Sequence, residues 1–104
     1  MHPLIEQHRE QIAALCRQYG VRRLDVFGSI LREDFDPAGS DVDVVAEFAS
    51  QAAEGGLRRY VDFKATMEAL LKRPVDVIEL DAMEDTRLKR IIERTRVPVY
   101  AAAA

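Results

Sequence analysis

The chain is organised around two short stretches, Val26-Phe27-Gly28-Ser29 and Ser40-Asp41-Val42-Asp43-Val44-Val45. Each combines an apolar run typical of a β-strand with small or polar residues. On a strand, Asp41 and Asp43 are two residues apart and point to the same side of the sheet. Their Cα atoms are then about 6.5 Å apart, from a rise of ~3.3 Å per residue. We therefore expect two carboxylates on one face and the intervening valines on the other.

Length, composition and charge limit the class of protein. With 104 residues, the chain fits one small domain spanning 1–104, and its 48% hydrophobic content allows a modest core. The net charge of −3 argues against direct nucleic-acid binding, although a local basic patch could still hold a nucleotide. We recognise no signal peptide and no apolar run near the ~18 residues of a membrane helix, so we expect a cytoplasmic protein. The single cysteine, Cys16, is expected to be a reduced, partly buried thiol.

Apolar periodicity predicts alternating helices and strands. The expected order is a helix over Pro3–Tyr19, a strand over Val21–Phe27, a short helix or turn at Ile30–Arg32, a strand over Asp41–Phe48, a helix over Leu57–Lys72, a strand over Val75–Leu80, a helix ending near Thr95, and a candidate final strand over Val97–Tyr100. Glu33–Ser40 and Ala49–Gly56 have loop composition, and Asp81 with Glu84 has the spacing of a helix cap. This order indicates an α/β (α+β) domain, a small sheet with helices packed on it, without fixing the strand order.

The paired carboxylates are candidates for a metal site. Carboxylates this close repel each other and need a cation or solvent, and Mg²⁺ prefers oxygen ligands. Alone, Asp41-x-Asp43 is more often the solvated side of a strand. Asp76 makes a metal site more favoured than a solvated strand, because it interrupts an otherwise apolar strand. If the two strands are neighbours, three carboxylates can converge and hold two cations; otherwise Asp76 is a partly exposed strand acid.

Small and basic residues near the carboxylates are candidates for binding phosphate. Gly28 lets the backbone approach a phosphate, and Ser29 can donate from its hydroxyl and amide. A helix starting at Ser29 would add positive potential. Arg32 could reach a triphosphate or pair with a carboxylate, and Ser40 precedes the acidic pair. In isolation, Gly-Ser is an ordinary turn and Arg32 an ordinary surface arginine.

Other polar residues are given structural interpretations. Asp25 alternates away from its apolar neighbours and is left as an acid at the rim of the core. His8 falls on the apolar stripe of the first helix, so we do not expect it to be a metal ligand. Asp34 and Asp36 are expected to solvate a loop.

Taken together, Val26-Phe27-Gly28-Ser29, Arg32, Ser40-Asp41-Val42-Asp43 and Val75-Asp76-Val77 resemble the minimal nucleotidyltransferase family, within the DNA polymerase beta-like superfamily. The family pattern is a hydrophobic-Gly-Ser stretch, a gap, Asp-x-Asp, and a later Asp on a neighbouring strand. The resemblance covers most of the chain. It implies a nucleotidyltransferase fold, a small mixed β-sheet flanked by helices. It also implies phosphate contacts from the Gly-Ser pair and a metal-binding, catalytic triad of Asp41, Asp43 and Asp76.

The resemblance further implies an activity and a partner. The activity is transfer of a nucleoside monophosphate from a nucleoside triphosphate, expected to be ATP, to a hydroxyl, with one or two Mg²⁺ ions. Small stand-alone members are often antitoxins of HEPN-domain toxins, which they adenylylate on a tyrosine or mask by binding. Little chain remains for a second substrate pocket, so we expect another chain to supply the acceptor. A non-catalytic binding module and the catalytic subunit of a small-molecule nucleotidyltransferase remain alternatives, and a homo-oligomer is left open.

Overall fold

A computed structural model describes residues 2–32, 35–36, 39–49 and 55–102. Its elements, in chain order, are α1 (Pro3–Gln7), α2 (Arg9–Gln18), β1 (Val21–Phe27), the 3-10 helix η1 (Gly28–Leu31), β2 (Val42–Phe48), α3 (Gly56–Leu71), β3 (Val75–Ile78), the 3-10 helix η2 (Leu80–Ala82), α4 (Arg87–Thr95) and β4 (Val97–Ala101). Parts of the two predicted loops, including Asp34, lie outside the described residues. None of the described helices combines the length and apolar character needed to cross a membrane.

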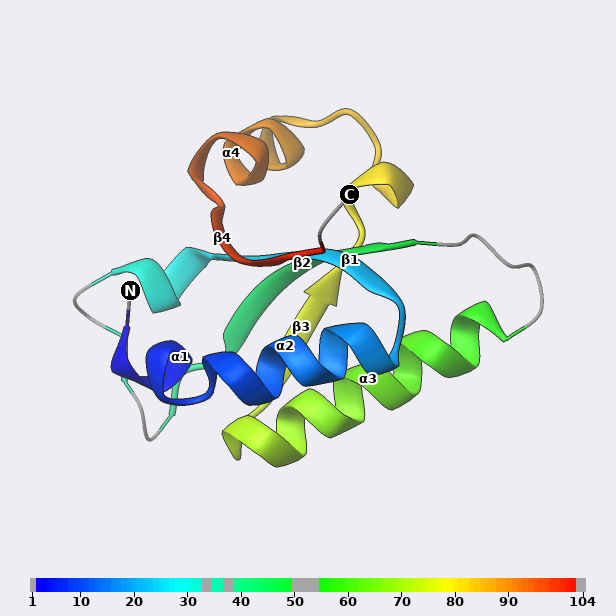
Figure 1. Cartoon of the computed structure of the whole chain (residues 1–104). Coiled ribbons are helices and arrows are strands. Elements are labelled where there is room, and N and C mark those ends of the chain that lie inside the picture. The colour runs from blue at the N-terminus through cyan, green and yellow to red at the C-terminus, as the bar shows by residue number, and fades with distance from the viewer. Residues whose placement is uncertain (1, 33–34, 37–38, 50–54, 103–104) are drawn as a thin grey trace.

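The strands form one mixed sheet in the order β3-β2-β1-β4. β1 runs antiparallel to both β2 and β4, whereas β2 and β3 are parallel. The sheet separates two layers: α1, α2 and α3 cover one face, and α4 covers the other (Figure 1). This arrangement confirms the predicted small mixed sheet flanked by helices, and it confirms Val97–Tyr100 as a strand.

The larger core lies between the sheet and the α1–α3 layer. Because side chains alternate along a strand, the even-numbered residues Val42 and Val44 of β2 enter this core and are fully buried. They pack in one cluster with Phe63 and Met67 of α3. The odd-numbered residues of β2, including Asp43, therefore lie on the face that α4 covers, as the Asp-x-Asp spacing predicts.

The core under α4 is small. It consists of Val45 from β2, Leu80 from η2 and Ile92 from α4, with three partly buried apolar residues packed against them: Phe27, Ile78 and Met83. α4 contributes one buried residue, Ile92, to this contact. The face of the sheet that carries Asp43 is thus covered by a helix that is attached through few apolar contacts.

The N-terminal segment forms two helices, so the prediction of one helix over Pro3–Tyr19 is wrong. His8 separates them, with φ −112° and ψ 10°. Its ring Nδ1 lies 2.9 Å from the carbonyl oxygen of Leu4, the group that its own amide would bond in a continuous α-helix. The His8 amide bonds the carbonyl of Ile5 instead, at 3.2 Å. The His8 ring therefore competes with the backbone, and a break results.

The start of the last helix also differs from the prediction. Asp81 lies in η2, and α4 begins at Arg87 with Thr86 as its N-cap. The Thr86 hydroxyl accepts a hydrogen bond from the amide of Lys89 at 3.2 Å, which satisfies a donor that the helix leaves free. β3 ends at Ile78, two residues before the predicted end, because the chain turns into η2.

The thin contact under α4 gives a stability prediction. Replacing Ile92 with Ala should lower the free energy of unfolding by about 2–4 kcal/mol, because it removes the only buried side chain that α4 places against the sheet. The neighbouring Ile91 is 37% exposed, so I91A should cost less than about 1 kcal/mol. Urea unfolding followed by circular dichroism measures both. Equal losses for the two variants would contradict this account of α4.

Candidate active site

The register between β1 and β2 brings the two organising stretches together. Phe27, the last residue of β1, pairs with Asp43 of β2, so the chain leaves the sheet at Gly28 beside the Asp43 carboxylate. Gly28 has φ +74°, a conformation that residues with a Cβ rarely adopt. A Cβ placed there would lie 2.7 Å from Asp43 Oδ2. Both the backbone conformation and the close approach therefore require glycine at this position.

Asp43 and Asp76 are directly opposite each other on parallel neighbouring strands. Asp43 is half-buried, and burial is the main cause that raises its pKa, to about 6 from an ordinary value of 3.8. The negative charge of Asp76 and a hydrogen bond between the two carboxyl groups raise that pKa further, and Asp41 adds a smaller repulsion. The site thus holds negative charges close together.

Ser29, Asp41 and Arg32 lie around this pair. The Ser29 hydroxyl donates a hydrogen bond to the backbone carbonyl of Asp41 at 3.3 Å, which ties η1 to the start of β2. Asp41 is exposed and immediately precedes the strand rather than beginning it. Arg32 is exposed, and its positive charge opposes the other influences by lowering the pKa of Asp43.

Ser40 and η1 both precede Asp41 in the chain and are held by local contacts. The Ser40 hydroxyl accepts a hydrogen bond from the amide of Asp36 at 3.0 Å, and the Ser40 amide donates to the Asp36 carbonyl at 2.8 Å. These bonds close a turn next to the site. The predicted helix at Ser29 is a four-residue 3-10 helix, too short for an appreciable helix dipole.

Asp43 contacts both Gly28 and Asp76. Asp41 lies just before the first residue of β2 and acts on Asp43 through its charge. Within the described residues, no three acidic, histidine or cysteine side chains stand ready as a metal-ligating group. The chemistry of the donor set nevertheless fits a hard cation, because Asp43 and Asp76 offer only carboxylate oxygens and share an unneutralised charge. Asp41, beside them, could turn toward a cation that the other two hold.

Asp25 is the polar residue whose position the sequence left undecided. It lies on β1 opposite Val45 and is completely buried. Its Oδ1 accepts a hydrogen bond from Arg23 Nε at 3.1 Å, and its Oδ2 lies 3.0 Å from Arg23 and 3.3 Å from Arg96 Nε. Two guanidinium groups thus neutralise this carboxylate. The spacing of Arg23 and Asp25, two residues apart on one strand face, was the signal in the sequence.

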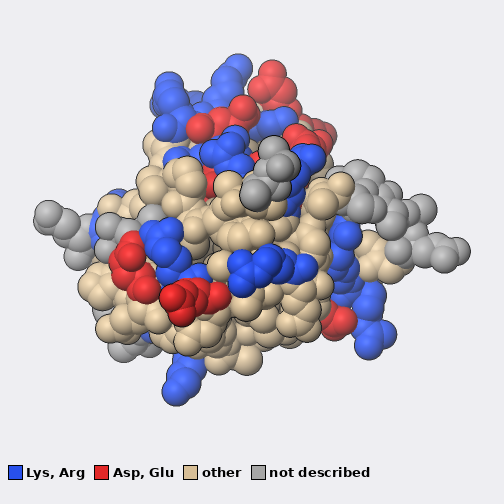
Figure 2. Space-filling model, viewed as in Figure 1, with Lys and Arg blue, Asp and Glu red and all other residues tan. Residues whose placement is uncertain are grey.

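The sheet face with the carboxylates is overlaid by a basic helix. Lys and Arg gather over the α4 layer, with a few acids among them (Figure 2). The helix contributes Arg87, Lys89, Arg90 and Arg94 against one acid, Glu93. Since the whole chain has a net charge of −3, α4 is a local concentration of positive charge. Such a field favours the approach of an anion such as a nucleoside triphosphate.

Similarity to known proteins covers nearly the whole chain. The family described as the nucleotidyltransferase domain matches residues 8–99. A solved structure assigned as a minimal nucleotidyltransferase has a TM-score of 0.70 and 29% sequence identity, over 94% of this chain and 96% of that one. Among curated proteins, no sequence matches.

Two toxin–antitoxin crystal structures share the fold. One, solved with AMP-PNP, has a TM-score of 0.68 and 16% identity over 90% of this chain and 73% of that one. The other, of the MntA-HepT pair, has a TM-score of 0.65 and 16% identity over 93% of this chain and 73% of that one. At these identities the likeness concerns the fold alone.

Substituting Gly28 tests the close approach to Asp43. G28A should destabilise the protein by more than the ~1–2 kcal/mol of a left-handed alanine, because its Cβ would also collide with Asp43 Oδ2. Gly55 is the matched control: its φ is +79°, and a Cβ there meets nothing within 4 Å. The difference between G28A and G55A in chemical denaturation isolates the contact with the carboxylate. If G28A and G55A lose the same free energy of unfolding, the collision of the alanine Cβ with Asp43 has no energetic effect.

The raised pKa of Asp43 can be measured directly. Carbon-detected NMR titration should give a pKa of about 6 for this carboxyl. D76N should lower that pKa more than D41N does, because Asp76 contributes both charge and a hydrogen bond. A pKa of Asp43 that does not respond to D76N would contradict the coupling.

The same shift fixes the sign of a stability effect. Because the pKa of Asp43 is higher in the folded state, its contribution is fully present below pH 3.8 and is lost as pH rises through about 6. D76N should therefore stabilise the fold at pH 8 more than at pH 4. After screening by solvent, we expect about 1 kcal/mol, or roughly 4–8 °C in Tm. D85N, on the exposed connection before α4, is the control and should show no such dependence.

Proposed function

The chain belongs to the nucleotidyltransferase domain family, and we propose that it transfers AMP from ATP to a tyrosine hydroxyl of a HEPN-type toxin. One observation carries the chemical part of this proposal. Gly28 packs directly against Asp43, and Asp43 is in register with Asp76. A glycine that lets the backbone turn directly against a pair of carboxylates supports a site for a metal-bound phosphate.

The proposed reaction is a displacement at phosphorus. The acceptor hydroxyl oxygen attacks the α-phosphorus of ATP, and the bond from that phosphorus to the bridging oxygen of the β-phosphate breaks. Pyrophosphate leaves with the bonding electron pair. The proton of the hydroxyl passes to a carboxylate of the site, for which Asp76, exposed beside Asp43, is our candidate. Burial and the charge of Asp76 raise the pKa of the neighbouring Asp43 carboxyl to about 6, so the site can hold a proton near neutral pH.

Each residue of the site has a distinct part in this proposal. Asp43 and Asp76 would hold Mg²⁺, with Asp41 as the third ligand, and the bound metal would supply charge neutralisation and a more acidic acceptor hydroxyl. Gly28 brings the backbone against the carboxylates, and Ser29, already bonded through its hydroxyl to the carbonyl of Asp41, would donate its hydroxyl or amide to a phosphate. Arg32 orients the phosphates from the exposed side.

The proposed acceptor is a protein, which could bring its own hydroxyl to the exposed Asp76. The two cavities that Glu47 and Asp81, and Tyr19 and Arg58, line do not include the carboxylates of the site. The shared fold with the toxin–antitoxin structures supports a toxin as the partner, which makes this chain the antitoxin. Such a pairing places the tyrosine on one chain and the ATP site on the other.

The activity is tested by intact-mass spectrometry with a purified HEPN-type toxin as the candidate acceptor. Incubation with ATP and Mg²⁺ should add one adenylate to that protein, and D43N or D76N should reduce the rate at least ~10²-fold. The control is D85N, which changes an exposed acid away from the site and should leave the rate within about twofold. An unimpaired D43N would rule out the metal assignment.

A second result of this experiment would favour a different function. If the partner is inhibited without any gain in mass, the chain acts by masking its toxin. In that case D43N should keep complex formation and inhibition unchanged. Withdrawal of Mg²⁺ with a chelator separates the two outcomes further, because masking needs no metal and adenylate transfer does.

A further inference from the structure

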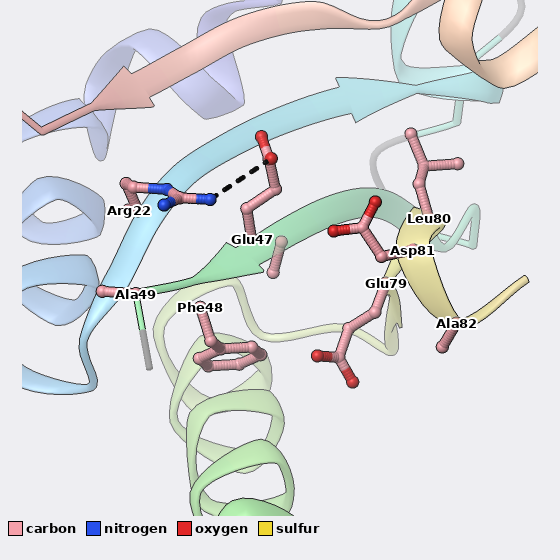
Figure 3. Close-up of a pocket in the computed structure, with 9 residues that line it drawn as sticks. Arg22, Glu47, Phe48, Ala49, Glu79, Leu80, Asp81 and Ala82 are labelled. Carbon is pink, nitrogen blue, oxygen red and sulfur yellow. Dashed lines mark ion pairs between the residues drawn. The ribbon is translucent and has the colours of Figure 1, made fainter. Parts of the chain in front are cut away.

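A cavity of about 510 Å³ lies at the far end of β2 from Gly28. Its walls come from the C-terminal end of β2, from η2 and from Arg22 of β1. Figure 3 shows Glu47 and Asp81 on one side of this end of β2 and Glu79 on the other. The volume falls in the range of ordinary ligand sites, although the proposed reaction does not use it.

Among the described residues, nothing pairs with the edge of β2 at this cavity. β3 pairs with β2 only as far as Ile78, opposite Val45, and the chain then turns into η2. The Val42 amide bonds Pro74 on the β3 side, and the Ala49 amide bonds Gly20 on the β1 side. Because backbone groups alternate along a strand, the amide and carbonyl of Phe48 point to the β3 side. Among the described residues, no backbone group pairs with Phe48 on that side.

The sheet is protected at its two outer edges, which sets this opening apart. On β3, the carbonyl of Val77 accepts a hydrogen bond from the Tyr60 hydroxyl at 2.7 Å. On β4, the carbonyl of Val99 accepts one from Arg9 Nη1 at 3.0 Å, and Pro98 removes a donor. Proteins commonly block exposed edges in this way to prevent unwanted strand pairing. The end of β2 has no such block in the described part of the chain.

Charge indicates what could fill the opening. Glu47, Glu79 and Asp81 face the cavity against a single cation, Arg22. Arg22 lies 3.9 Å from Glu47 and is 60% exposed, and Arg23, which is shared with Asp25, lies 4.0 Å from Glu47, so both pairs are long and neutralise it only in part. In an added strand, successive side chains alternate between the two sides of the sheet. Basic side chains could therefore meet Glu47 and Asp81 on one side and Glu79 on the other.

We propose that this cavity binds an extended, basic segment of the partner protein, which adds to β2 as a short strand beyond the end of β3. The proposal rests on the proposed function in taking the acceptor to be a protein. Glu47 and Asp43 lie on the same face of β2, about 13 Å apart from four rises of ~3.3 Å. Val45, between these two residues, is buried under Leu80 and Ile92, so a partner anchored here would reach the carboxylates over the outside of that small core. Main-chain bonds would supply affinity and the acids would select a basic sequence.

The test uses ¹⁵N-labelled protein and a short blocked peptide of alternating lysine and valine. Titration should shift the amide of Phe48 and slow its hydrogen exchange, with little change at Gly28. A glutamate–valine peptide of equal length should bind at least ~10-fold more weakly. Equal binding of the two peptides, or shifts that miss Phe48, would overturn the proposal. The same shifts on raising protein concentration alone would also overturn it, because a second copy would then be the occupant.

A charge-reversal pair controls for general electrostatics. D81K should raise the Kd of the lysine–valine peptide about 3- to 10-fold, whereas E84K, the same change at an exposed position outside the cavity, should raise it less than twofold. Equal effects would assign the binding to overall charge and overturn the site. This titration needs neither ATP nor transfer, so its failure and failure of the adenylate assay are separate results.

Discussion

The contact between Gly28 and the carboxylate of Asp43 constrains the whole site. It exists because β1 and β2 pair in one register, and that register is fixed from the opposite face of the sheet. There, Val42 and Val44 are fully buried, so a slip of one residue would expose them and bury Asp43 in the main core. The hydrophobic core thus positions a carboxylate that it does not itself touch. The site is a consequence of the packing on the other side of the sheet.

Two acids on the same face of the sheet, Asp25 and Asp43, have neighbours of opposite charge. Asp25 is more deeply buried than Asp43, yet two arginines neutralise it. Asp43 is instead placed opposite another acid, which raises its pKa. A chain that can supply arginines to one carboxylate could supply them to the other. At Asp43 the charge of Arg32 does not outweigh burial and the charge of Asp76, and this excess of negative charge suits a site for an external cation.

The sequence predicted what depends on local spacing. Alternation around Asp43 predicted its strand and the face it occupies, and the order of elements was predicted correctly except for the break at His8 and the 3-10 helix η2 before α4. Features that depend on residues distant in the chain could not be predicted in this way. The pairing of Asp43 with Asp76 needed a neighbouring strand that no local pattern specifies. Asp25 remained undecided because its second arginine, Arg96, comes from beyond α4. His8 broke a helix through a ring contact that apolar periodicity does not register.

β2 links the proposed chemistry to the proposed recognition. β3 is long enough to place Asp76 opposite Asp43 but ends before it can cover Phe48. One short strand thus both completes the carboxylate pair and leaves an opening further along the same neighbour. Binding energy gained at the opening can assist a reaction about 13 Å away only if the connecting element is rigid. The buried middle of β2, with Val44 and Val45 at 0% and 1% exposure, meets that requirement, and no hinge interrupts the described strand.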